Sequence, residues 1–185
     1  MAIYAAGRAG RATIRAAQMQ RPQVLFLVKF FAVLIVAYLL IAWNPVNDRV
    51  IVPFTVGIAH GSGVLLQWMG ENVKIAGTMI SGPSFGVNIN NGCNGVEAML
   101  ILLASIVAFP ASMKARAVGL ILGAIVVQLL NAVRIITLYL LGAYHPKVFD
   151  LFHTAVWQIV IILAAIGFFL VWSARVSPSR VANSS

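Results

Sequence analysis

The chain has 185 residues, of which 61% are hydrophobic and only 9% are charged. A soluble globular domain carries about 25% charged residues, so this composition excludes a soluble fold and makes membrane lipid the solvent for most of the chain. The net charge of +9 does not indicate nucleic-acid binding, because the basic residues flank apolar runs and no motif interleaves them with aromatic side chains. We therefore predict an all-α membrane protein with one transmembrane domain over about residues 24–175.

Four apolar stretches are predicted to form a bundle of about four transmembrane helices. A basic segment, residues 1–23, precedes the first stretch, and no small-residue cleavage site follows it, so we expect an uncleaved signal anchor. The second stretch is short, which fits either a helix that spans through tilt or local thinning of the bilayer or one that begins inside a protein-lined cavity. The predicted spans cover about residues 24–43, 93–109, 117–141 and 153–173.

The segment between the first two spans, residues 44–92, is predicted to lie at the outer face. Residues 52–69 are apolar but contain the sequence HGSG at 60–63, which favours an interfacial or re-entrant helix over a fifth span. Loosely alternating β-branched residues at 72–90 surround the sequence SGP at 81–83 and predict a small β-hairpin. The outer face is therefore expected to carry one helix and one hairpin.

The basic residues beside the spans predict the orientation of the chain. If the helices alternate, most of these residues fall on one side, which is then the cytoplasmic side. The N-terminal segment, the loop at 110–116 and the polar tail at 176–185 are accordingly predicted to be cytoplasmic. The basic residues on this side are Arg8, Arg11, Arg15, Arg21, Lys114, Arg116, Arg175 and Arg180, and those in the opposite loops are Arg49, Lys74 and Lys147.

Cys93 is the single cysteine, so an intramolecular disulfide and a structural zinc cluster of cysteines are both excluded. It lies in the sequence NGCNG at residues 91–95, a polar turn that opens into the second span. The N-terminus of a helix stabilises a thiolate, and the flanking glycines allow a substrate backbone to approach closely. The alternative is that Cys93 is a small apolar side chain that packs within the helix.

Three polar residues at intervals of three, Gln128, Asn131 and Arg134, lie on one face of the third span. A charge inside the membrane is a functional-site hypothesis by default, and the polar stripe argues for an inward-facing guanidinium rather than one that snorkels to the headgroups. His153, which alone fits an interfacial anchor, begins the fourth span at the same outer level. The predicted topology brings Cys93, Arg134 and His153 to the outer ends of three helices, where they can share one site.

Glu97 lies four residues after Cys93, which predicts that both occupy one helix face. A carboxylate near the membrane boundary needs a partner, and Arg134 or His153 would serve. A structural role for Glu97, holding the arginine in place, and a catalytic role are equally open.

Two further sequence patterns are weaker candidates for a functional site. Residues 82–86 match the G-x-S-x-G pattern of serine hydrolases, but Ser84 falls in a predicted hairpin turn rather than between a strand and a helix. His60, His145 and Asp150 lack the spacing of a metal-binding motif, so we predict neither a metal site nor a cofactor.

The sequence NGCNG at 91–95, the sequence NAVRI at 131–135 and His153 ahead of the last span resemble, in order and topology, the exosortase and archaeosortase family. The short exosortases of type H are the most similar. The resemblance implies a cysteine protease or transpeptidase in the bacterial inner membrane, with its active site at the periplasmic face. Its partners would be secreted proteins with a C-terminal sorting signal, which comprises a short motif, often Pro-Glu-Pro, a transmembrane helix and a basic cluster.

The resemblance assigns the family's catalytic cysteine, arginine and histidine to Cys93, Arg134 and His153. Asn131 matches the asparagine before the arginine and is assigned a positioning role. Asn94 and Glu97 complete the predicted set of supporting residues. The outer segment at about 52–90 is expected to bind the recognition motif.

The implied mechanism is an attack of the Cys93 thiolate on the scissile carbonyl, which forms a thioester. Arg134 would stabilise the oxyanion and His153 would move protons, although either could instead stabilise the thiolate. One rival reading is a non-enzymatic membrane assembly or channel subunit, in which Arg134, Glu97 and Gln128 form a structural polar network. A second rival is a serine intramembrane protease that uses Ser84.

Overall fold

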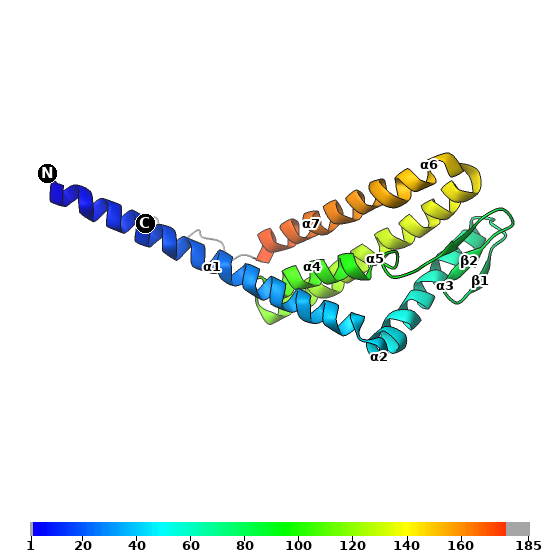
Figure 1. Ribbon diagram of the computed structural model, residues 1–185, viewed down its shortest axis with the longest axis horizontal. Helices are drawn as coiled ribbons and strands as arrows, with labels where there is room; N and C mark the ends of the chain where they lie inside the picture. The colour runs from blue at the N-terminus through cyan, green and yellow to red at the C-terminus, as the bar shows by residue number, and fades with distance from the viewer. Residues whose placement is uncertain (1, 177–185) are drawn as a thin grey trace.

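A computed structural model describes the backbone of residues 2–176 and the side chains from residue 21 onward (Figure 1). Most of this chain is helical, and the predicted fold class, an all-α membrane protein, is confirmed. The predicted tail at 176–185 lies, apart from Val176, outside the described residues. The long helices are α1 (Ala2–Ala42), α3 (Val52–Trp68), α4 (Val96–Ala108), α5 (Met113–Tyr144) and α7 (Trp157–Val176).

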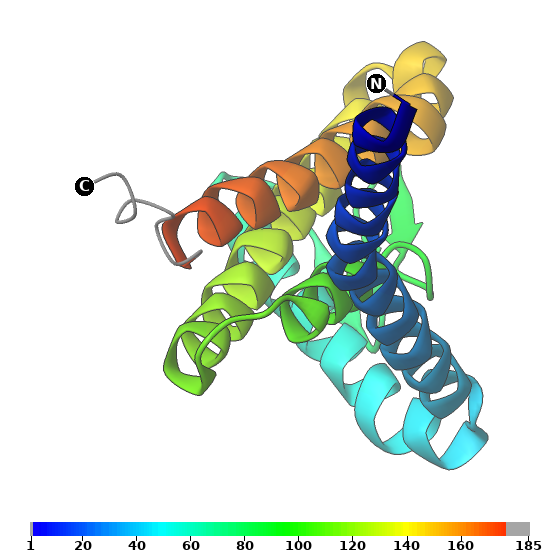
Figure 2. The same ribbon diagram turned by 90° about the vertical axis from the view of Figure 1, so that its left-hand side faces the viewer.

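Helices α1, α4, α5 and α7 form the bundle, with α4 in contact with each of the other three (Figures 1 and 2). The chain runs through α1 and α5 in one direction and through α4 and α7 in the other (Figure 1). The loop between α4 and α5 and the end of α7 therefore lie at the same end of the bundle. This alternation is the topology from which the orientation was predicted.

The helices long and apolar enough to cross a membrane are not quite the four that the sequence predicts. In the described part of the chain they are Arg21–Ala42, Asn44–Trp68, Met113–Tyr144 and Pro146–Val176. Helix α4 has 13 residues and is about 20 Å long, which is shorter than the hydrocarbon layer of about 30 Å. Helix α3 qualifies by length and composition, yet it leads from α1 toward the sheet and does not run back along α1 (Figure 1).

The predicted hairpin is present and is extended to a three-stranded antiparallel sheet of order β1-β2-β3. Strands β2 (Met79–Ser81) and β3 (Gly86–Asn88) form the expected hairpin. A second tight turn adds β1 (Lys74–Ala76), and Gly77 supplies the positive φ, +58°, that this turn requires.

The sheet packs against α3 and α5, where Ile80 and Ile89 join a buried cluster with Leu66, Ile135 and Tyr139. The close fit depends on small residues. A Cβ atom at Gly82 would overlap the hydroxyl of Tyr139, and one at Gly142 would overlap the ring of Phe85. These contacts therefore fix the hairpin against the C-terminal half of α5.

The last helical stretch begins earlier than the sequence predicts. Helix α5 ends at Tyr144, and after His145 the chain enters α6 (Pro146–Leu151), a π-helical turn (Phe152–Val156) and α7 without a break. His153 therefore lies about two turns inside this helix instead of at its start. A π-helical turn is rare and often marks a functional site, because it changes the direction in which side chains point.

Candidate active site

Cys93 lies in the turn before α4, not in the helix itself, which begins at Val96. Its backbone N–H donates to the carbonyl of Asn90 at 2.9 Å. Gly92 and Gly95 flank it with φ of +88° and +76°, conformations that residues with a Cβ rarely adopt. The glycines therefore shape the turn that presents the half-buried thiol.

Asn94 holds this turn in place. Its side chain is completely buried, and its Nδ2 donates to Thr55 Oγ1 at 3.0 Å and to Asn91 Oδ1 at 3.3 Å. Its Oδ1 accepts the N–H of Val96 at 3.1 Å, which satisfies a backbone donor at the start of α4. Asn94 thus ties the thiol-bearing turn to α3, a contact between residues 39 positions apart that sequence reasoning missed.

Arg134, on α5, reaches the same turn. Only 5% of its surface is exposed. Its Nη2 lies 3.9 Å from the Sγ of Cys93, and its Nη1 donates to the carbonyl of Gly92 at 3.5 Å. The guanidinium therefore faces inward, as the polar stripe predicts, with its charge next to the thiol.

Asn131 lies one turn below Arg134 and is completely buried against Gly95. A Cβ at Gly95 would come within 3.0 Å of its Cγ. Within the described residues neither polar atom of Asn131 has a hydrogen-bond partner. Asn131 therefore packs against the turn without a hydrogen bond to the guanidinium, and it sets how closely the turn approaches α5.

His153 completes the group from the π-helical turn. Its Nε2 lies 3.5 Å from the Sγ of Cys93, within hydrogen-bonding range for sulfur. The imidazole stacks on Phe149, with ring centroids 5.5 Å apart and an angle of 23° between the planes. The stacking fixes the ring plane, so one imidazole nitrogen points at the thiol. Phe149, an apolar residue without a motif, gave no signal in the sequence.

Glu97 has a different partner from the one that the sequence predicts. Its Oε1 accepts the N–H of Gly92 at 2.9 Å, whereas Arg134 and His153 were the expected partners. The reason is that Cys93 precedes the helix, so Cys93 and Glu97 do not share one helix face. Glu97 holds the N–H of Gly92, and the carbonyl of the same residue accepts from Arg134.

A pocket of about 320 Å³ opens beside the thiol. Cys93, Arg134 and His153 line one part of it, and β3 lines another. Ser84, by contrast, is exposed in the turn between β2 and β3. It lacks the strand-to-helix geometry of a nucleophilic serine, which removes the main support for the serine-protease rival.

The fold and this pocket define a class of protein: a multi-pass membrane protein with a thiol, an imidazole and a guanidinium gathered at one cavity. The transmembrane exosortase family matches residues 20–172, which is most of the chain. This protein belongs to the transmembrane exosortase family. No curated protein and no solved structure matched the chain.

Proposed function

We propose that this exosortase-family protein is a cysteine peptidase or transpeptidase that cleaves C-terminal sorting signals of secreted proteins. One observation carries the proposal: the Sγ of Cys93 lies 3.5 Å from the Nε2 of His153 and 3.9 Å from the Nη2 of Arg134. A nucleophile beside a base and a fixed cation is the arrangement that covalent acyl transfer requires.

In the proposed first step, the Nε2 of His153 takes the proton of the Cys93 thiol, and the thiolate attacks the scissile carbonyl carbon. The carbonyl oxygen becomes an oxyanion, which the guanidinium of Arg134 stabilises. His153 then returns the proton to the leaving nitrogen as the carbon–nitrogen bond breaks. An acceptor amine or water finally attacks the thioester and releases the acyl group, which restores the thiol.

Arg134 suits the oxyanion role because its position is fixed from two sides. It is buried, and the carbonyl of Gly92 holds one end of its planar group while the other end faces the thiol. A donor held in place before the reaction stabilises a developing charge without the cost of reorganisation.

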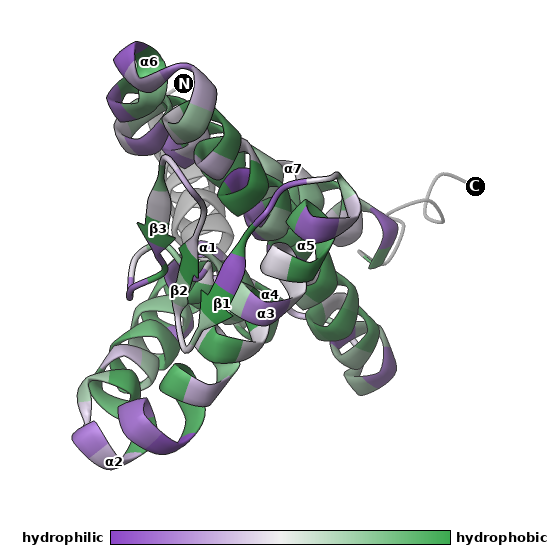
Figure 3. Cartoon of the chain, turned by 90° about the vertical axis from the view of Figure 1, so that its right-hand side faces the viewer, coloured by the Kyte–Doolittle hydropathy of each residue, from purple (hydrophilic) through white to green (hydrophobic). Residues whose placement is uncertain are grey.

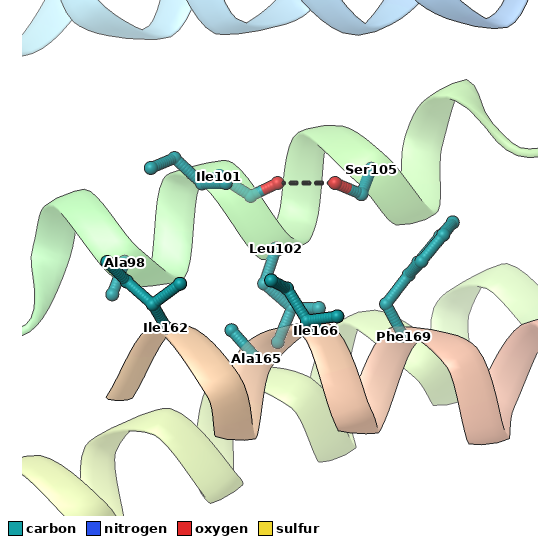
Figure 4. A pocket seen from close by; sticks show the side chains of 8 residues that line it. All are labelled: Ala98, Ile101, Leu102, Ser105, Ile162, Ala165, Ile166 and Phe169. Atoms are coloured by element: carbon teal, nitrogen blue, oxygen red, sulfur yellow. Dashed lines mark hydrogen bonds between the residues drawn. The ribbon is translucent and has the colours of Figure 1, made fainter. Parts of the chain in front are cut away.

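The proposed substrate is anchored in the same membrane as the enzyme. An apolar groove of about 230 Å³ runs between α4 and α7, the helices that follow Cys93 and His153 in the chain (Figure 4). Ala98 and Ala165 contribute small side chains to its lining, and Leu102 and Phe169 also line it. A client's transmembrane helix seated there would hold its recognition motif near the thiol, which supplies proximity.

The proposed location is the bacterial inner membrane, with the sheet and the pocket at the periplasmic face. Basic residues at two helix ends support this orientation. Lys114 and Arg116 lie near the start of α5 and Arg175 in the last turn of α7, and both of these helix ends lie away from the sheet (Figure 1). A basic cluster that ends the client's signal would then remain on the cytoplasmic side.

The test is processing of a reporter that carries a tripartite signal: a recognition motif, a transmembrane helix and a basic cluster. The reporter is co-expressed with the native chain or with Cys93→Ala at equal membrane levels. We expect a size shift with the native chain and less than about 0.1% of that rate with the variant. Ser84→Ala serves as the matched control and should process normally. Unchanged processing by Cys93→Ala would reject thiol catalysis and favour the structural polar network.

A further inference from the structure

We infer that the free edge of β3 binds the client's recognition segment as an added fourth strand. The inference rests on the proposed function and adds to it how the substrate backbone is held. Strand β3 is an edge strand, since the order of the sheet is β1-β2-β3. Figure 3 shows it on the side of the sheet nearer α6, away from β1. This is the side on which the pocket lies.

The hydrogen-bond pattern shows which backbone groups face the free edge. Gly82 N–H donates to the carbonyl of Phe85 at 2.8 Å, and Ile89 N–H donates to the carbonyl of Thr78 at 3.0 Å. In an antiparallel pair, successive residues point their N–H and C=O groups alternately toward and away from the partner strand. Phe85 and Ile89 therefore face β2, and so does Val87 between them.

Gly86 and Asn88, the two residues in the alternate positions, present their N–H and C=O groups to the free edge. Both residues are exposed, and Gly86 has no side chain that would hinder an approaching backbone. The strand GVN carries neither a proline nor a charged residue, two features that commonly block the pairing of edge strands. The edge therefore offers two donors and two acceptors to an extended peptide.

The same edge belongs to the catalytic pocket. Residues 86–89 line the cavity together with Cys93, Arg134 and His153. After Asn88 the chain passes through Asn90, whose carbonyl accepts the N–H of Cys93. A peptide paired with β3 therefore lies in the cavity that contains the thiol.

The far wall of the pocket consists of Ile135 and Leu138 from α5 and of Phe149. Side chains of an added strand alternate between the two faces of the sheet, so every second residue of the segment would meet this apolar wall. Main-chain pairing supplies affinity, and the pocket for alternate side chains supplies selectivity. The expected ligand is thus an extended segment that is read at every second position.

Disulfide trapping tests the pairing directly. Cys93→Ala removes the only thiol of the chain, and Asn88→Cys then introduces a single one at the edge. The tripartite reporter carries one cysteine at a time along its recognition segment. Paired residues in adjacent strands have Cα atoms about 4.5–5.5 Å apart, within the range of a disulfide. We expect cross-linking yields that alternate with a period of two residues.

Met79→Cys is the matched control, because Met79 pairs with Asn88 but lies one strand further from the free edge. It is also exposed, so it is equally available to an unspecific thiol reaction. We expect at most background cross-linking from it. Similar yields at consecutive reporter positions, or equal yields from Met79→Cys and Asn88→Cys, would overturn strand pairing.

A processing assay with Cys93 intact provides the second test. Asn88→Pro removes an N–H that faces the free edge and the side-chain oxygen that accepts from Thr78 Oγ1, but it spares the backbone bonds to β2. Processing should therefore fall about tenfold. Asn72→Pro, in the exposed loop before β1, is the control, because the N–H of Asn72 makes no hydrogen bond within the described residues. Equal rates for these two variants at matched membrane levels would contradict the inference.

A failure of strand pairing can be distinguished from a failure of the proposed mechanism, because disulfide trapping needs no thiol chemistry at Cys93. If the cross-linking yields show a two-residue period but processing does not depend on Cys93, the proposed mechanism is rejected and the strand pairing is retained. Cys93-dependent processing without that period would reject the strand alone.

Discussion

The interior of the bundle and the interior around the thiol differ in the chemical character of their buried side chains. In the bundle, Leu102, Ile106 and Val127 pack with Trp172 in an apolar cluster, and packing of this kind has no strict direction. Around the thiol, four polar residues, Thr55, Asn94, Asn131 and Arg134, are buried beside the apolar Ile89 and Ile135. A buried polar group stabilises a fold only when its partners are in place, whereas an apolar one tolerates small changes of shape.

This difference predicts that the site region is more sensitive to mutation than the bundle. The site is assembled from the turn before α4, from α3, from α5 and from the π-helical turn, and few contacts hold each part. A small shift of any one element changes the distances at the sulfur. The bundle, in contrast, distributes its packing over whole helices. We therefore expect conservative changes to be costly at the site and mild in the bundle.

Arg134→Lys should cause the largest loss of processing among these variants. The substitution keeps the charge and most of the side-chain volume. Lysine cannot reproduce the planar fork that contacts both Gly92 and Cys93, so reporter processing should fall about a hundredfold. The rate is measured at matched membrane levels, with thermal stability in detergent recorded in parallel. Near-normal turnover would count against recognition of the oxyanion by Arg134.

Asn94→Ala should have the next largest effect. The substitution leaves the N–H of Val96 without its partner, and a buried polar group left unpaired costs about 1–3 kcal/mol. It also removes the donor to Thr55 Oγ1, which keeps its bond to the carbonyl of Ile51. We expect a lower midpoint of unfolding together with at least a tenfold loss of processing, because the turn is released from α3. A stable variant with native activity would show that the turn is held by other contacts.

Gly95→Ala should cost about 1–3 kcal/mol of stability, because it places a side chain at φ +76° and against Asn131. Gly57→Ala in α3 is the matched control, since a Cβ there meets open space. That control should be neutral or stabilise the protein by up to about 1 kcal/mol. If both variants unfold at the same temperature, the close approach of the turn to α5 is not essential.

The smallest effect should come from Ile106→Val in the centre of the bundle. Loss of one buried methyl group costs about 0.5–1.5 kcal/mol, and the reaction geometry should not change. Processing of the reporter should stay within about twofold of the native rate. A loss as large as that of Asn94→Ala would break the distinction between the two regions.

The sequence predicts well those features that depend on hydropathy and on short motifs. Apolar runs reveal α1, α5 and α7, and the polar stripe that ends in Arg134 indicates its inward orientation. The approach of Cys93, Arg134 and His153 follows from alternating helices, because this alternation brings all three residues toward the same end of the bundle. Topology alone therefore accounts for most of the candidate site.

Features that depend on long-range contacts or exact helix ends were not predictable. No local pattern marks the bond from Asn94 to Thr55, and only Gly77 indicates the turn that adds β1. Glu97 was paired incorrectly because the sequence does not reveal that α4 begins after Cys93. Helix propensity likewise gives no sign of the π-helical turn that carries His153.

The most direct test of the central claim is to intercept the thioester. The native chain processes the tripartite reporter in the presence of hydroxylamine, and the new C-terminus of the product is analysed by mass spectrometry. An acyl group held on Cys93 should react with hydroxylamine, so we expect a C-terminal hydroxamate with the native chain and none with Cys93→Ala. A product from the native chain that carries only a carboxylate, or a hydroxamate formed without Cys93, would contradict covalent catalysis by this thiol.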